Sequence, residues 1–86
     1  MPEEEEFEEW LKVAEQRETY CRGRIELEEA KALDKKGEKV ASSRRYHSAS
    51  SIFARLAGEI GKTPDRSEME TLARFCKAWS QMEEAE

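Results

Sequence analysis

Few side chains in this sequence are of the kinds that carry out chemistry, and their spacing does not assemble a reactive site. The only imidazole is His47, and the only thiols are Cys21 and Cys76. A histidine base needs an orienting acid or a nucleophile beside it, and zinc sites need Cys and His at short spacings. Neither arrangement can be found, so we expect no catalytic residue, no metal site and no cofactor, and we expect that the protein is not an enzyme.

One short motif resembles part of a phosphate-binding loop. Gly61-Lys62-Thr63, with Gly58 before it, matches the end of that loop. The full motif needs a further glycine where Leu56 stands, and it must join a strand to a helix. Here the stretch follows a predicted helix. A glycine that ends one helix and a threonine that begins the next therefore explain these residues better.

Length and composition indicate one small helical domain. The chain has 86 residues, of which 37% are hydrophobic and 41% charged, a balance typical of helical bundles. Two cysteines are too few for a disulfide framework, and no signal peptide or apolar run of about 18 residues is present. We therefore expect a cytoplasmic protein without a membrane span, with both thiols free and placed as small core residues.

Charge is distributed unevenly along the chain. Residues 1–30 hold eleven acids and four bases, whereas residues 31–55 hold seven bases and two acids. A basic patch of this kind can touch phosphates, but the net charge is -5 and the aromatic residues lie on helix core faces instead of among the bases. These features weigh against a nucleic-acid partner. The patch comprises Lys35, Lys36, Lys39, Arg44 and Arg45.

The first forty residues predict one long helix over residues 3–41. They are rich in Glu, Lys, Leu, Ala and Arg and contain no proline after Pro2. Gly23 leaves open a second reading, in which this helix breaks and the domain has four helices. The main apolar stripe has i, i+3, i+4, i+7 spacing and consists of Phe7, Trp10, Leu11 and Ala14, continued by Cys21, Ile25 and Ala32. A second, weaker stripe consists of Val13, Tyr20 and Leu27.

Two further helices are predicted over residues 44–60 and 64–85. Ser42 and Ser43 favour a helix start. The third helix begins either at Thr63-Pro64 or at Ser67, which forms a capping box with Glu70. The second stripe is Tyr46, Ala49, Phe53, Leu56 and Ile60, and the third is Met69, Leu72, Ala73, Cys76, Trp79 and Met82, widened by Phe75. No stop signal precedes Glu86, so the chain looks cut from a longer protein, although it could simply end there.

The expected fold is an all-α antiparallel three-helix bundle that forms a single domain over residues 1–86. The spacing of Gly37, Tyr46, Ala49 and Phe53 predicts a tight helical hairpin. In this interpretation Gly37 is the small residue that lets two helix backbones approach, and the aromatic rings fill the remaining space.

The same residues carry a family resemblance. From Leu33 to Phe53 the chain resembles a tetratricopeptide repeat, because Gly37, Tyr46, Ala49 and Phe53 match its small, aromatic, alanine and aromatic positions. The stretch from 26 to 86 is also similar to a MIT domain, a three-helix bundle related to one such repeat. Arg44 stands where the repeat has a glycine, and the segment between Asp34 and Tyr46 is longer than the MIT pattern.

The resemblance implies a noncatalytic protein–protein interaction domain that binds a helix or peptide tail between its first and third helices. By that analogy the binding surface involves Lys31, Lys35, Glu68, Leu72, Phe75 and Trp79.

The alternative is a structural homodimer. The long first helix overhangs the others and would bury Phe7, Trp10, Leu11 and Ala14 against a second copy.

Overall fold

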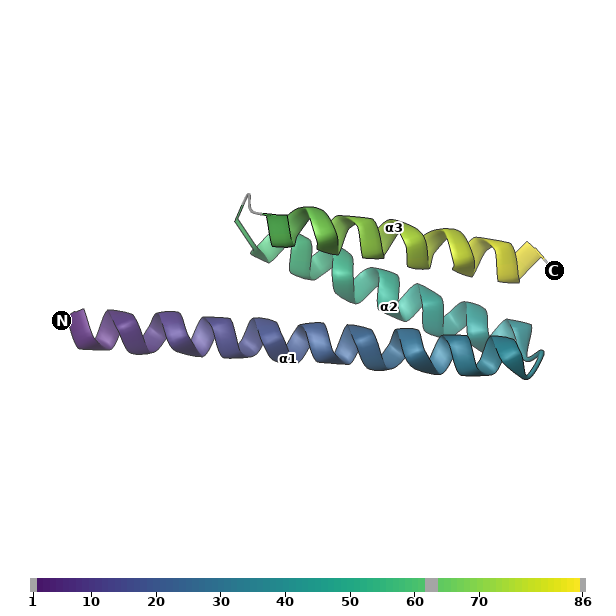
Figure 1. Ribbon diagram of the computed structural model, residues 1–86, viewed down its shortest axis with the longest axis horizontal. Helices are drawn as coiled ribbons and strands as arrows, with labels where there is room; N and C mark the ends of the chain where they lie inside the picture. The colour runs from purple at the N-terminus through teal and green to yellow at the C-terminus, as the bar shows by residue number, and fades with distance from the viewer. Residues whose placement is uncertain (1, 62–63, 86) are drawn as a thin grey trace.

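The structure is a computed structural model that describes residues 2–61 and 64–85. Three helices account for nearly all of these residues, and none of them forms a strand. The helices are α1 (Pro2–Lys35), α2 (Lys39–Glu59) and α3 (Pro64–Ala85). They run alternately up and down (Figure 1). The predicted all-α antiparallel three-helix fold is therefore confirmed, and the third helix has the predicted bounds.

The first helix is continuous through Gly23, so the alternative of a break at that residue is wrong. Gly23 is buried where α1 crosses α2, and a Cβ placed there would lie 2.7 Å from Cε1 of Phe53. The missing side chain thus makes room for an aromatic ring of the neighbouring helix. A glycine inside a helix lowers the stability of that helix by only about 1 kcal/mol relative to alanine. The residues on both sides of Gly23 are good helix formers, so the helix continues past it.

The boundary between the first two helices differs from the prediction. Helix α1 ends at Lys35 instead of 41, and α2 begins at Lys39 instead of 44. Gly37 makes the turn, with a φ of +79° that L side chains rarely adopt. The N–H of Gly37 donates to the carbonyl of Asp34, and that of Glu38 donates to the carbonyl of Leu33. Gly37 is therefore a turn residue with open space around it, and the prediction that it lets the backbones approach is wrong.

The two serines expected to cap the second helix lie inside it instead. The Ser42 hydroxyl is buried and donates to the Ala30 carbonyl of α1 at 3.0 Å. The Ser43 hydroxyl donates to the Ser80 carbonyl of α3 at 2.9 Å. A serine is small and can satisfy its own hydroxyl on a neighbouring backbone, so both positions allow close helix packing. Ser67, the other proposed start of α3, likewise lies within that helix.

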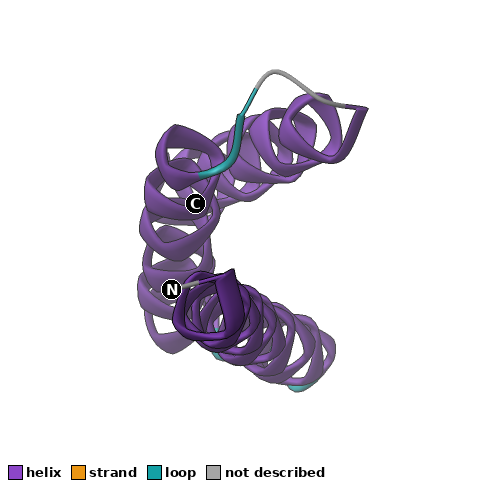
Figure 2. Cartoon of the chain, turned by 90° about the vertical axis from the view of Figure 1, so that its left-hand side faces the viewer, coloured by secondary structure: helices purple, strands orange, loops and turns teal. Residues whose placement is uncertain are grey.

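Helix α2 is the centre of the fold. It packs against both α1 and α3, whereas α1 and α3 hardly touch each other, so the three helices form an arc when viewed along the long axis (Figure 2). Tyr46, Ala49 and Phe53 are buried, as predicted. The full core consists of Leu27, Ala30, Tyr46, Ala49, Phe53, Leu56, Ala57, Met69, Ala73 and Cys76.

Helix α1 packs through the stripe that the sequence makes the weaker one. Tyr20, Gly23, Leu27 and Ala30 face the core. The main apolar stripe is exposed instead, because α2 approaches α1 closely at two small residues on the other side: Gly23 makes room for the Phe53 ring, and the Ala30 carbonyl accepts from Ser42. We call this exposed surface the outer face of α1; it consists of Phe7, Trp10, Leu11, Ala14, Cys21 and Ile25. Cys21 is exposed, which corrects its placement in the core.

Helix α1 also extends past the end of the other two. It has 34 residues against 21 in α2, which at 1.5 Å per residue is a difference of about 20 Å. Residues 2–15 are all exposed, and Figure 1 shows this part of α1 beyond the connection between α2 and α3.

The contact between Gly23 and Phe53 predicts opposite effects of alanine at two helical glycines. Overpacking in a buried contact typically costs about 1–3 kcal/mol, which exceeds the gain in helix propensity of at most about 1 kcal/mol. We expect Gly23→Ala to lower the free energy of unfolding by about 1 kcal/mol or more. Gly58→Ala, with nothing within 4 Å of its Cβ, should raise that free energy by up to about 1 kcal/mol. Urea unfolding followed by circular dichroism measures both. Equal effects of the two substitutions would contradict the packing role of Gly23.

Candidate interaction surface

The surface between α1 and α3, on the open side of the arc, carries aromatic residues that are only partly covered. The Trp79 ring stacks on the Tyr46 ring of α2, with centroids 6.0 Å apart and planes 21° apart. The Phe75 ring lies beside the Trp79 ring, with centroids 6.1 Å apart. The Phe75 side chain is 45% exposed. Leu72 is half-buried one turn earlier. We call this surface the concave face; its α3 wall is apolar.

The opposite wall of the concave face belongs to α1 and is charged. Arg24 and Lys31 lie close enough to Cys76 for their charges to lower the pKa of its thiol. Both cations also pair with the carboxylate of Glu28, at 3.1 and 3.5 Å. Lys35 is exposed one turn beyond Lys31. The concave face therefore presents a cationic rim on one side and aromatic rings on the other.

Cys76 lies beneath this surface, where its thiol is a poor nucleophile. Its side chain is fully buried, and burial raises the pKa of its thiol to about 11 in spite of the two nearby cations. A nucleophilic cysteine requires the thiolate, which this site disfavours at neutral pH. Cys76 thus fills space in the core.

At the far end of the concave face, residues of all three helices line an open hollow of about 410 Å³. It lies where α1 begins to extend past the other two helices. Its lining contains both polar and apolar residues, and each of the three helices contributes apolar ones. The lining residues are Val13, Gln16, Arg17, Tyr20, Leu56, Ile60, Asp65, Glu68 and Met69. The hollow extends the concave face toward the free part of α1.

The structure groups the predicted site residues in two places. Leu72, Phe75 and Trp79 lie together on α3, and Lys31 and Lys35 lie on α1. The other predicted set lies on the outer face of α1, where Phe7, Trp10 and Leu11 are 68%, 79% and 50% exposed. Ala14 is exposed beside them.

Sequence reasoning missed two members of the concave face. Tyr46 fits the core stripe of α2, and only its stacking with Trp79 shows that it also forms the base of this surface. Arg24 was not singled out. The i, i+4 spacing of Arg24 and Glu28, followed by Lys31, could have indicated a charged ridge on this side of α1.

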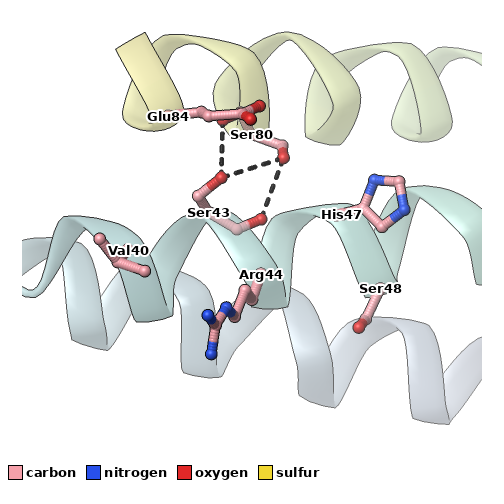
Figure 3. Close-up of a pocket in the computed structure, with 7 residues that line it drawn as sticks. All are labelled: Val40, Ser43, Arg44, His47, Ser48, Ser80 and Glu84. Carbon is pink, nitrogen blue, oxygen red and sulfur yellow. Dashed lines mark hydrogen bonds between the residues drawn. The ribbon is translucent and has the colours of Figure 1, made fainter. Parts of the chain in front are cut away.

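A second hollow of about 650 Å³ lies between α2 and α3 (Figure 3). The Ser43 hydroxyl donates to the Ser80 carbonyl, and the Ser80 hydroxyl donates to the Ser43 carbonyl at 3.0 Å. Both hydroxyls are therefore engaged in joining the helices. His47 lines the same hollow, but no hydrogen bond joins it to either serine within the described chain. The arrangement lacks the linked base and nucleophile that acyl transfer needs.

The ends of the three helices meet at a cluster of three charged residues. The Lys39 ammonium of α2 lies 2.7 Å from Asp34 of α1 and 3.5 Å from Glu83 of α3. Glu83 is only 3% exposed, and neither of its carboxylate oxygens has a hydrogen-bond partner among the described residues. Burying an ionised carboxylate without hydrogen bonds raises the free energy of the folded state. A protonated Glu83 could instead donate to the Asp34 carboxylate.

Burial and the adjacent carboxylate of Asp34 raise the pKa of Glu83, against the opposing effect of Lys39. The pKa of Asp34 is lowered instead, chiefly by the neighbouring Glu83 and next by the Lys39 ammonium, which donates to Asp34 at 2.7 Å. When this pair holds a single proton, that proton therefore resides on Glu83 and not on Asp34.

Three other features can be located in the described residues: groups that could bind a metal ion, helices that could cross a membrane, and the ion pairs of the basic patch. Within residues 2–61 and 64–85, no group of three or more His, Cys, Asp and Glu side chains is placed to hold a metal ion. No helix in the described chain has the length and apolar character needed to cross a membrane. Of the basic patch, Lys39 is engaged by Asp34 and Glu83, and Arg45 pairs with Glu26 and Glu29 at 3.0 and 3.1 Å.

Comparisons with protein-family models, with curated proteins and with solved structures gave no match to this chain.

The raised pKa of Glu83 predicts a pH-dependent stability that its amide variant lacks. A carboxyl whose pKa is higher in the folded state stabilises fully below its unfolded pKa, near 4.5, and loses that contribution as the pH rises through the folded pKa. The free energy of unfolding of Glu83→Gln relative to the parent should therefore increase as the pH rises from 4.5. Urea unfolding between acidic and neutral pH measures this difference. Glu84→Gln, at an exposed neighbouring position, is the control. A difference that is constant with pH would contradict the raised pKa.

Proposed function

We propose that this chain is a noncatalytic protein–protein interaction module, of the tetratricopeptide-repeat and MIT kind, that binds an amphipathic helix of another protein on its concave face. The observation that carries the proposal is the open arc. Because α1 and α3 both pack on α2 and hardly on each other, Phe75 and Trp79 keep exposed surface next to a buried core. Partly exposed aromatic rings beside a groove are typical binding hot spots.

The charge of the concave face favours a particular kind of ligand. Arg24, Lys31 and Lys35 stand on the α1 side, with Glu28 as the acid among them. A helix that places apolar residues against Leu72, Phe75 and Trp79 would turn one flank toward these cations. We therefore propose a ligand helix with an acidic flank. Rim charges mainly increase the association rate and the specificity.

A second candidate function is structural self-association. It is favoured by the large apolar side chains that the outer face of α1 exposes, such as Phe7 and Trp10. A cytoplasmic location fits either function, because a reducing compartment keeps thiols such as Cys21 and Cys76 free.

Binding on the concave face can be tested with Trp79 as the reporter. Trp10→Phe leaves Trp79 as the only tryptophan. The probe is a synthetic amphipathic helix of about 18 residues, or about 27 Å, with leucines on one face and glutamates on the flanks. We expect saturable quenching or shift of Trp79 emission, and weaker binding of a matched peptide that carries lysines in place of the glutamates.

Two variants in the Trp10→Phe background locate the site. Phe75→Asp should reduce the affinity at least tenfold, or about 1.4 kcal/mol, because it puts a charge where the ligand is apolar. Val40→Asp changes a 68% exposed apolar residue at the hollow between α2 and α3, and it should leave the affinity unchanged. Equal affinities for both variants, or no preference for the acidic peptide, would contradict the proposal.

A further inference from the structure

The end of the concave face at which α1 and α3 finish is cationic. Residues 24–35 of α1 place three bases on this side, Arg24, Lys31 and Lys35, with Glu28 as the acid among them. The α3 wall at the same end is apolar and contains Trp79. The charged cluster where the three helix ends meet pairs within itself. Three bases against one acid give the α1 wall at this end a net charge of +2.

The opposite end of the concave face is acidic. The hollow at that end is lined by two acids, Asp65 and Glu68, and by one base, Arg17, which together give a net charge of −1. Asp65 lies in the first turn of α3. From Arg17 to Lys35 the concave face follows α1 for 18 residues, or about 27 Å. A ligand helix of that length would therefore meet cations at one end of the concave face and acids at the other.

The directions of the three helices favour one direction for a ligand helix. Helices α1 and α3 run the same way and flank the concave face, whereas α2 runs the opposite way (Figure 1). Each helix carries a partial positive charge at its N-terminus and a partial negative charge at its C-terminus. A fourth helix that runs antiparallel to α1 and α3 completes the alternating order of an up-down bundle. Its dipole then opposes the dipoles of both neighbours.

The stability of the ligand helix itself selects the same direction. Acids stabilise the first turns of a helix, and bases stabilise its last turns. In the antiparallel direction the first turns of the ligand lie beside Lys31 and Lys35, which attract acids. The last turns lie beside Asp65 and Glu68, which attract bases. A parallel ligand would need the reverse order of charges, which opposes its own dipole.

We propose that the helix bound on the concave face runs antiparallel to α1 and α3 and has an acidic first half and a basic second half. The acidic half lies over Lys31 and Lys35, and the basic half lies over Asp65 and Glu68. This inference rests on the proposed function, and it adds the direction of the ligand and the order of its charges. The acidic flank of the ligand is thereby limited to its N-terminal half.

Spin-label distances determine the direction. In a Cys21→Ser background the remaining thiol, Cys76, is buried, so a label at Lys36→Cys, exposed beside the cationic end, is selective. The probe is a synthetic amphipathic helix of about 18 residues, or about 27 Å. It has leucines on one face, glutamates on the flanks of its first half and lysines on those of its second half. One preparation carries a label at the first residue of the probe and another at the last.

We expect a short distance from the protein label to the first residue of the probe, and a distance to the last residue that is longer by up to about 27 Å. Binding is measured separately by the emission of Trp79 in the Trp10→Phe chain. Absence of a saturable change would overturn both the proposed function and this inference. Binding with equal distances, or with the last residue nearer, would leave the proposed function standing and overturn the direction.

A reversal of charge tests the part played by the cationic end. The double substitution Lys31→Glu and Lys35→Glu should weaken binding of the same probe about fivefold or more, because two attractive contacts become repulsive. Lys12→Glu with Lys77→Glu makes the same change in net charge at exposed positions away from the concave face. At 100° per residue Lys77 points about 160° away from Phe75, so this control should leave the affinity unchanged. Equal losses in the two variants would overturn the proposed order of charges.

Discussion

The contact between the Phe53 ring and the backbone of α1 at Gly23 determines how this small domain is arranged. The space that a Cβ at Gly23 would need is filled by the ring, so α1 can lie against α2 only with that side turned inward. The buried Leu27 and Ala30 follow on the same side one and two turns later. The rotation of a 34-residue helix about its own axis is thereby fixed by one glycine and one aromatic ring.

Two surfaces follow from that rotation. Because the small residues of α1 face the core, its larger apolar residues, such as Phe7, Leu11 and Ile25, face solvent along the outer face. Because α2 is occupied by α1 on one side and α3 on the other, the side between α1 and α3 stays open. Trp79 lies there on Tyr46 and is not sealed in a closed bundle core. Each outer helix thus packs with one face on α2 and leaves another face exposed.

Sequence reasoning succeeded where the signal was local or strongly periodic. The start of α3 at Pro64 follows from proline chemistry, and the buried run Tyr46, Ala49 and Phe53 follows from helical period. It failed where two signals compete. Ser42 has the chemistry of a helix cap, yet its hydroxyl donates across to α1, and the positive φ of Gly37 ends the first helix six residues earlier than expected.

The inner and outer faces of α1 could not be assigned from hydrophobicity, because close packing selects small residues that score as weakly apolar. Gly23 reads as a helix breaker until its contact with Phe53 is known. The burial of Glu83 has no signal in the local sequence either, because it depends on the approach of Asp34 from α1 and Lys39 from α2.

The most direct measurement of the rotation of α1 is the reactivity of the two native thiols. Cys21 lies on the outer face and is exposed, whereas Cys76 is fully buried in the core. Alkylation of the folded chain at low concentration, followed by peptide mass spectrometry, should modify Cys21 rapidly and Cys76 only as fast as the protein unfolds. Protection of Cys21 in dilute monomeric protein, or reaction of Cys76 at an equal rate, would mean that α1 presents a different face to α2, and the account of both surfaces would fail.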